Sequence, residues 1–226
     1  SNSPGGIINL ISKTGEQEGG AIQFTGGLDY GEYRLDADYG AKLGEDLFFH
    51  IGGFYRQGEG PRNIGYDGNK GGQVKVNLTK KFANGFIRLH GKYLNDRAVG
   101  YLPNPVRVTG SDGNPNYSNV PNFDISGDSL HSRNFISAVS LNAGNTPQTF
   151  NIREGQHPVV KAFGFEGEVE IADGLTLSNR FRYSDVSGAF VSPFPGSIDT
   201  AANVATDLGG AGTTLRLERG SADSTV

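Results

Sequence analysis

The sequence predicts an all-β fold made of long antiparallel strands. Apolar residues recur with a period of two in seven separate segments, which is the periodicity of a strand with one covered face. Glycine accounts for 35 of the 226 residues and aromatic residues for 10%, a composition typical of β-structure with many turns. No apolar run is long enough for a transmembrane helix.

The seven strands are expected at 20–31, 33–43, 46–57, 71–82, 85–96, 159–172 and 174–186. From the second to the seventh, the apolar faces carry Leu35, Ala37 and Tyr39; Leu47, Phe49 and Ile51; Val74, Val76 and Leu78; Ile87, Leu89 and Tyr93; Phe163, Phe165 and Val169; and Leu175, Leu177 and Phe181. The opposite faces are rich in Lys, Arg, Asp and Glu. Segment 46–57 is a mixed case, because Phe48 and Phe54 share the polar face with His50 and Arg56.

Turn chemistry supports antiparallel pairing of neighbouring segments. Asn84-Gly85 is a preferred pair for a type I′ turn, and at the turn centre it places Ala83 opposite Phe86. Residues 172–174 fit a three-residue hairpin with Gly174 in the left-handed conformation. Tight turns are expected after the second, fourth and sixth strands, with longer or looser connections after the third and fifth.

Strand length favours a membrane barrel over a soluble β-sandwich. Every segment has at least eleven residues, whereas ordinary strands have about five or six and a membrane crossing needs about 9–11. The four segments that run in one direction each end their apolar face with a tyrosine: Tyr30, Tyr55, Tyr93 and Tyr183. Tyrosines at one level are typical of a membrane interface. We therefore expect an antiparallel transmembrane β-barrel, in which these residues form a girdle.

In such a barrel the polar faces line the interior. Pairing through the turn at Asp173-Gly174 places Glu166 across from Arg180. A lumen charge ladder is then expected from Arg88, Lys92, Glu166, Glu168, Arg180 and Arg182. Opposite charges on adjacent strands stabilise a sheet, so a structural role in the wall is favoured over a role in transport.

The first residues break the alternation. Ser3-Pro4-Gly5-Gly6-Ile7-Ile8-Asn9-Leu10-Ile11-Ser12-Lys13 resembles the last strand of the plug domain of TonB-dependent outer-membrane receptors. The resemblance implies that residues 1–15 end a plug and that 16–226 form the first part of the barrel. It implies about seven of an expected twenty-two strands. Because the sequence has no Met, we expect an internal fragment.

What the resemblance implies about function is energised uptake of a scarce nutrient, such as a ferric siderophore or similar chelate. The location would be the bacterial outer membrane, and the partners would be membrane lipid, the nutrient, and TonB through a segment outside this sequence. A monomer is expected. Two rival interpretations are a passive porin, which would lack the plug motif, and a soluble β-sandwich lectin.

The sequence gives little indication of nucleic-acid binding, disulfides, metal binding or catalysis. The net charge of −4 argues against nucleic-acid binding, and the absence of cysteine excludes disulfides. Residues 112–116 resemble the start of a calcium loop, but Tyr117 and Phe123 stand where Gly and Glu are needed. The four histidines show no ligand spacing. We expect no enzyme activity, no cofactor and no metal.

Segment 97–158 is predicted to be a long extracellular loop. Its aromatic residues can anchor it and its prolines restrict it. Donors for an anionic chelate are Arg97, Tyr101, Arg107, His131, Arg133 and Arg153. Ligand binding by this loop and simple shielding of the barrel mouth remain equal alternatives.

Overall fold

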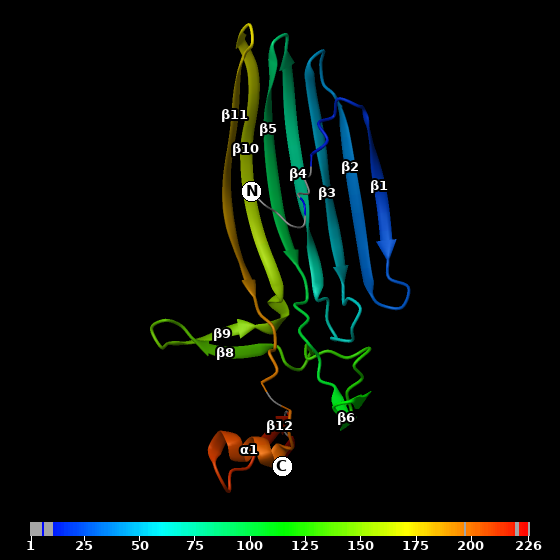
Figure 1. The fold of residues 1–226 in the computed structure, drawn as a ribbon, viewed down its shortest axis with the longest axis vertical. Coiled ribbons are helices and arrows are strands. Elements are labelled where there is room, and N and C mark those ends of the chain that lie inside the picture. Colours follow the sequence, from blue (N-terminus) through cyan, green and yellow to red (C-terminus); the bar gives the residue numbers. More distant parts are fainter. Residues whose placement is uncertain (1–5, 7–10, 197, 220–221, 226) are drawn as a thin grey trace.

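The structure is a computed structural model that describes Gly6 and residues 11–196, 198–219 and 222–225. One antiparallel sheet of seven strands dominates it, in the order β1-β2-β3-β4-β5-β10-β11 (Figure 1). These strands are β1 (Gly19–Gly26), β2 (Glu32–Lys42), β3 (Leu47–Gly58), β4 (Asn69–Phe82), β5 (Gly85–Arg97), β10 (Gln156–Ala172) and β11 (Leu175–Phe190). Each pairs with the next along the chain, except that a long insertion separates β5 from β10.

All seven expected strands are confirmed, but the first is shorter than expected. β1 ends at Gly26, so Tyr30 lies in the connection to β2 and the prediction that it ends a strand was wrong. The chain turns early because the Gly27 amide donates to the Glu32 carbonyl at 2.9 Å, and the Glu32 amide donates to the Tyr30 carbonyl at 3.1 Å. Tyr33, at the start of β2, instead lies on the apolar face beside Phe24.

The expected plug strand lies largely outside the described residues, which omit 1–5 and 7–10. In the part that is described, residues 11–14 form no strand, and the side chain of Ile11 is 86% exposed. A strand covered on both faces is therefore not observed at residues 11–14.

The turn between β4 and β5 is displaced from its expected centre. Phe82 lies opposite Gly85, so Ala83 and Asn84 form the tip, and Ala83 does not face Phe86. The cause is a contact with β10: the Glu170 amide donates to the Asn84 carbonyl at 2.8 Å, and Asn84 Nδ2 donates to the Glu170 carbonyl at 3.0 Å. Because the register differs by two residues, the faces are unchanged. Gly174 has φ +70°, as expected.

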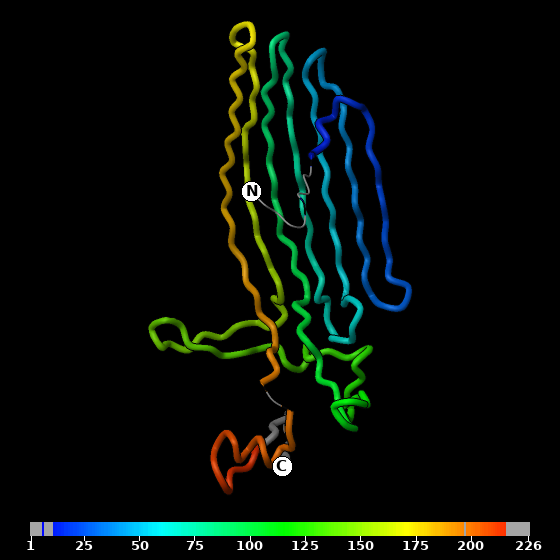
Figure 2. Tube along the Cα trace, viewed as in Figure 1, coloured from blue at the N-terminus to red at the C-terminus, as the bar shows by residue number. Residues whose placement is uncertain are grey.

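The connections separate into two classes at the two ends of the sheet (Figure 2). At the tight-turn end lie the short connections 43–46, 83–84 and 173–174. At the loop end lie 27–31, 59–68 and 98–155. This alternation confirms tight turns after the second, fourth and sixth strands.

The long insertion and the C-terminal part carry small elements of their own. They are β6 (Arg107–Ser111), β7 (Asn114–Ser118), β8 (Ser137–Leu141), β9 (Pro147–Asn151), the 3-10 helix η1 (Ile152–Glu154), α1 (Ala201–Gly209), β12 (Arg216–Arg219) and β13 (Ala222–Thr225). Segment 97–158 therefore contains two hairpins, β6–β7 and β8–β9. Among the described residues, no helix combines the length and apolar character needed to cross a membrane.

The two faces of the sheet differ in chemistry, as alternation predicts. The apolar face is open: Leu89 is 53% exposed, Phe163 57% and Leu177 59%. The smaller elements gather beyond the loop end of the sheet (Figure 1). No element of the described residues forms a second layer over the apolar face. The polar face carries the ion pairs that connect the strands.

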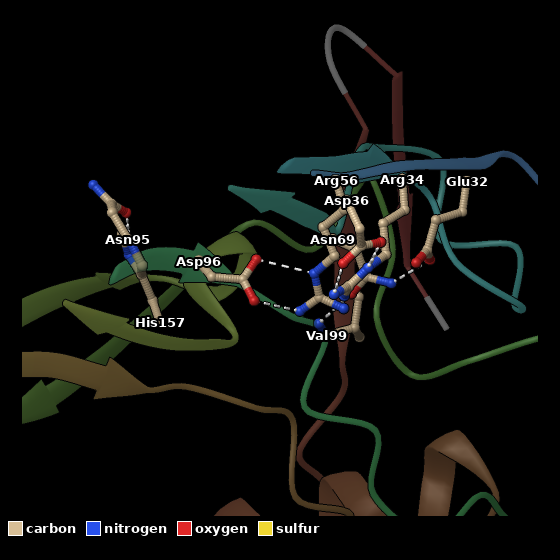
Figure 3. Close-up of polar contacts among 9 residues, drawn as sticks. All are labelled: Glu32, Arg34, Asp36, Arg56, Asn69, Asn95, Asp96, Val99 and His157. Carbon is tan, nitrogen blue, oxygen red and sulfur yellow. Dashed lines mark hydrogen bonds and ion pairs between the residues drawn. The ribbon is translucent and has the colours of Figure 1, made fainter. Parts of the chain in front are cut away.

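A polar clamp holds the strands together near the loop end (Figure 3). Arg56 on β3 reaches over β4 to Asp96 on β5, with Nε and Nη2 donating to the carboxylate at 2.9 and 2.8 Å. The residue between them is Gly71, which has no side chain to block the bridge. Both ends of the pair are largely buried, where a bidentate ion pair is stronger than at an exposed surface.

The clamp continues through an amide. Asn69 Nδ2 donates to Glu32 at 2.6 Å, and Asn69 Oδ1 accepts from the Val99 amide at 3.2 Å (Figure 3). This side chain therefore joins β2, β4 and the segment after β5. On the opposite face of the sheet, His157 of β10 makes another link between strands, with Nε2 2.8 Å from Asn95 Oδ1 on β5.

Candidate functional site

The polar face of the sheet forms a hollow of about 920 Å³. Its walls come from β2, β3, β4, β5, β10 and β11, and residues 11–13 lie along it. Most of its lining side chains are charged or can form hydrogen bonds, so the hollow suits a hydrated or anionic occupant better than an apolar one.

A short N-terminal segment is fastened to this face. Lys13 Nζ lies 2.8 Å from Asp38 Oδ2 on β2, and the Lys13 carbonyl accepts from Asn77 Nδ2 on β4 at 2.7 Å. Glu16 Oε2 accepts from Lys81 Nζ at 2.5 Å, and this hydrogen bond lowers the pKa of Glu16. We call residues 11–16 the latch segment, because contacts with two strands hold it.

Gly15 explains where the latch segment turns away from the hollow. It has φ +81°, a conformation that favours glycine, and an added Cβ would collide with the Phe49 carbonyl oxygen of β3. The expected boundary at residue 15 therefore coincides with a backbone position that requires glycine.

The charge ladder forms only in part. Glu166 faces Arg180, as expected, and it joins Arg88 Nη1 at 3.2 Å and Arg180 Nε at 3.1 Å. Glu168 instead accepts a hydrogen bond from Ser178. Among the described residues, Lys92 and Arg182 have no carboxylate within ion-pair distance.

The polar-face phenylalanines of β3 and β5 lie beneath cations. On β3, the guanidinium carbon of Arg34 is 4.0 Å from the ring centre of Phe54, and Lys81 Nζ is 5.6 Å from that of Phe48. On β5, the guanidinium carbon of Arg88 is 4.9 Å from the ring centre of Phe86. Cation–π contacts stabilise aromatic rings on a polar surface. They account for the mixed pattern of segment 46–57.

A second polar cluster lies at the loop end and is centred on His131, whose side chain is 2% exposed. His131 Nε2 is 3.2 Å from the Gly100 carbonyl and 3.3 Å from Ser192 Oγ, and Nδ1 is 3.4 Å from Tyr66 Oη. With Nε2 protonated, the ring donates to Gly100 and accepts from Tyr66. One imidazole thus joins the segments that follow β3, β5 and β11.

Burial sets the protonation of this loop cluster. It raises the pKa of Tyr101 to about 12 and also raises the pKa of Tyr66. It lowers the pKa of His131, and the hydrogen bond to Gly100 offsets only part of that effect. A low pKa keeps the imidazole neutral.

Five of the six expected ligand donors, all except Arg107, lie around the connection 59–68 between β3 and β4. Tyr101 contacts His131 edge-on, with ring centres 6.1 Å apart, and Arg153 lies over Tyr66 at 5.3 Å. Arg97 Nη2 donates to the Asp67 carbonyl at 3.1 Å.

Arg133 lies against Gly65 of the same connection. Arg107 is apart from the others, exposed on β6. His131 is too deeply buried to touch a ligand in this conformation, so its contacts indicate a structural role in the loop cluster.

Several contacts of the hollow and of the cluster around His131 were not expected from the sequence. The contact of Lys13 with Asp38 and the convergence of Tyr66 and Ser192 on His131 join residues far apart in the chain. Alternation carries no signal for such contacts. In the described part of the chain, no group of three or more His, Cys, Asp or Glu residues is arranged to hold a metal ion.

Comparison of the chain with known protein families, with curated proteins and with solved structures gives no match.

The latch segment should depend on Gly15. Gly15→Ala introduces strain and a backbone clash, so amide exchange of residues 11–18 should accelerate at least about tenfold, equivalent to about 1.4 kcal/mol. Hydrogen-exchange mass spectrometry of the intact protein measures this. Gly31→Ala is the control, since it has open space around its Cβ position. Equal exchange in wild type and Gly15→Ala would contradict the proposed anchoring.

The loop cluster should loosen in acid. Because folding lowers the pKa of His131, an open loop takes up a proton more readily than the closed one. The closed state is therefore fully stable above the ordinary histidine pKa of about 6.5 and loses stability as pH falls below it. Exchange of residues 98–101 and 128–133, corrected for intrinsic rates, should be faster at pH about 5.5 than at about 7.5. His131→Gln should remove this dependence; its persistence in the variant would rule out His131 as the cause.

Proposed function

We propose that the chain forms part of the wall of a bacterial outer-membrane β-barrel of the TonB-dependent receptor class. Its role would be energised uptake of a scarce nutrient, such as a ferric siderophore or similar chelate. The apolar face meets lipid and the polar face lines the interior. TonB would be reached through a segment outside this sequence.

The main support for this proposal is a constant distance between the tight-turn end of a strand and a tyrosine on its apolar face. In β3, β5 and β11, eight residues separate the first strand residue at the tight-turn end from a tyrosine on the apolar face. These pairs are Leu47 and Tyr55, Gly85 and Tyr93, and Leu175 and Tyr183. Eight residues span about 26 Å of strand, close to the apolar band of about 25 Å in membrane barrels.

The register of the strands indicates how far they would tilt for these tyrosines to lie at one level. Tyr55 shares a row with Gly72, whereas Tyr93 lies opposite Val74, two residues nearer the tight-turn end. Tyr93 in turn lies opposite Lys161, whereas Tyr183 lies opposite Phe163. The tyrosines thus step by one residue per strand. With a rise of about 3.3 Å and a strand spacing of about 4.8 Å, a level girdle requires a tilt of about 35°, within the range of membrane barrels.

Polar groups on the apolar face lie mostly outside the band. Lys161 and Asp185 occupy the row of Tyr93, at or beyond the tyrosine girdle. Lys80 is near the tight turns and pairs with Asp46 at 3.6 Å. Such positions are where lipid-facing charge destabilises least. Asn179 is an exception, an uncharged amide in the middle of the edge strand β11.

The rival interpretations fit less well. A β-sandwich needs a second sheet against the apolar face, and the described residues supply none. A passive porin would have the same strands, but it gives no reason for a segment held across the polar face by Lys13 and Glu16. A plug that enters the barrel from the tight-turn end accounts for that segment.

A charge in the middle of the lipid-facing band should destabilise the barrel. Leu89 is four residues from both Gly85 and Tyr93 on β5, so Leu89→Arg should lower stability by about 2–4 kcal/mol. Ser178→Arg is the control at a similar depth, three residues from Leu175 and five from Tyr183 on the polar face of β11, opposite Glu168, and it should change stability far less. Urea unfolding of the intact protein in lipid vesicles measures both. A larger effect of Ser178→Arg than of Leu89→Arg would mean that the faces are inverted.

The two ends of the sheet should lie on opposite sides of the outer membrane. The sequence contains no cysteine, so a single introduced thiol can be labelled specifically. In intact cells, a thiol at Gly113, in the β6–β7 turn, should react with a membrane-impermeant reagent, and one at Asn84 should not. Permeabilised cells supply the control in which both react. Equal labelling in intact cells would contradict this topology.

A further inference from the structure

Two pairs of like charges face each other across adjacent strands on the polar face. Arg34 on β2 lies directly opposite Arg56 on β3, and Lys75 on β4 lies directly opposite Lys92 on β5. Like charges in opposed positions destabilise a sheet. A neighbouring anion would offset the repulsion within each pair.

The arginine pair is compensated within the protein. Arg34 makes two hydrogen bonds of 2.7 Å to Asp36, and Arg56 makes a bidentate pair with Asp96 (Figure 3). No carboxylate of the described residues pairs with Lys75 or Lys92, and neither ammonium makes a hydrogen bond there.

The nearest acids are already engaged. Asp38, separated from Lys75 by Gly52 in the same row, holds Lys13 and His50 at 2.8 and 3.1 Å. Glu166 holds Arg88 and Arg180. The chain before Glu16 contains no Asp or Glu, so residues 11–13 bring no carboxylate to the hollow.

A third cation and a set of small residues complete the arrangement. Arg182 on β11 lines the same hollow as the two lysines, and within the described residues its side chain donates one hydrogen bond, from Nε to Ser184 Oγ at 3.0 Å. Gly52 and Ala162 flank the lysine row, which leaves space above it. In the next row, His90 lies over Gly164, where a Cβ would collide with the imidazole.

We propose that Lys75, Lys92 and Arg182 form a binding site for a small multivalent anion that carries carboxylate or phosphate groups. The two ammonium groups would contact one end of the anion, and the guanidinium would bind a second carboxylate or phosphate group in bidentate fashion. The site rests on the proposed function, since it lies in the interior of the barrel. It deepens that function by making the interior selective for anionic solutes.

The test uses the intact protein in detergent micelles, with citrate and inorganic pyrophosphate as probes in isothermal titration calorimetry. Lys92→Gln and Arg182→Gln should each weaken binding of the probes at least about tenfold, and added salt should weaken binding to the wild type. Lys70→Gln is the matched control: it removes the same charge from the same sheet, on the opposite face of β4. It should change affinity less than about twofold.

Three outcomes would overturn the proposal. The first is that neither probe binds the wild-type protein. The second is that Lys70→Gln weakens binding as much as Lys92→Gln does. In the third, binding occurs only after the residues upstream of Gly15 are removed, which would mean that the protein's own chain fills the hollow. Heat-modifiable electrophoretic mobility of the same samples separates this result from the proposed function, because a correctly folded barrel that binds neither probe contradicts the anion site alone.

Discussion

The structure depends on one constraint: paired strands alternate their side chains, so a continuous apolar face forms on one side of the sheet. That face stays open along the whole sheet, with Ile22 82% and Phe24 69% exposed at one edge. Exposed apolar surface of this extent is not stable in water. The constant interval to Tyr55, Tyr93 and Tyr183 matches the thickness of a bilayer, which is why lipid is the cover we propose.

The polar face follows a different rule, which is local charge neutrality. Arg56 and Asp96 neutralise each other across β4 because Gly71 leaves the path open. Glu166 serves two arginines at once. Lys75 and Lys92 depart from this rule. Asp38, the acid in the same row as Lys75, already pairs with Lys13 of the latch segment.

Much of the fold could be predicted from the sequence, because strand periodicity is a local property. The assignment of residues to the two faces is correct even where the predicted position of the turn is wrong. A turn centred on Asn84-Gly85 would set Lys75 opposite Leu94, whereas the structure sets it opposite Lys92. A contact with Glu170, far away in the chain, overrode the turn preference. The opposed lysines therefore could not be predicted.

The loop end was the least predictable part. The aromatic residues and prolines of 97–158 predicted an anchored loop, and the structure places two hairpins in it, but the positions of its side chains depend on the connection 59–68 and on Ser192. His131 illustrates the difficulty, because an imidazole in a polar sequence suggests a ligand contact while its buried position makes it a structural group. Composition predicts that such a loop is ordered and leaves open which side chains remain free.

We propose that lipid covers one face of the sheet and water the other. The most direct measurement places nitroxide labels singly at positions 87 to 92 of β5 in the intact protein in lipid vesicles. Collision rates with oxygen and with a water-soluble nickel chelate are then compared by electron paramagnetic resonance. If lipid covers the apolar face, accessibility should alternate with a period of two, with oxygen dominant at Ile87, Leu89 and Gly91 and the chelate dominant at Arg88, His90 and Lys92. High chelate accessibility at Leu89, or no alternation, would contradict it.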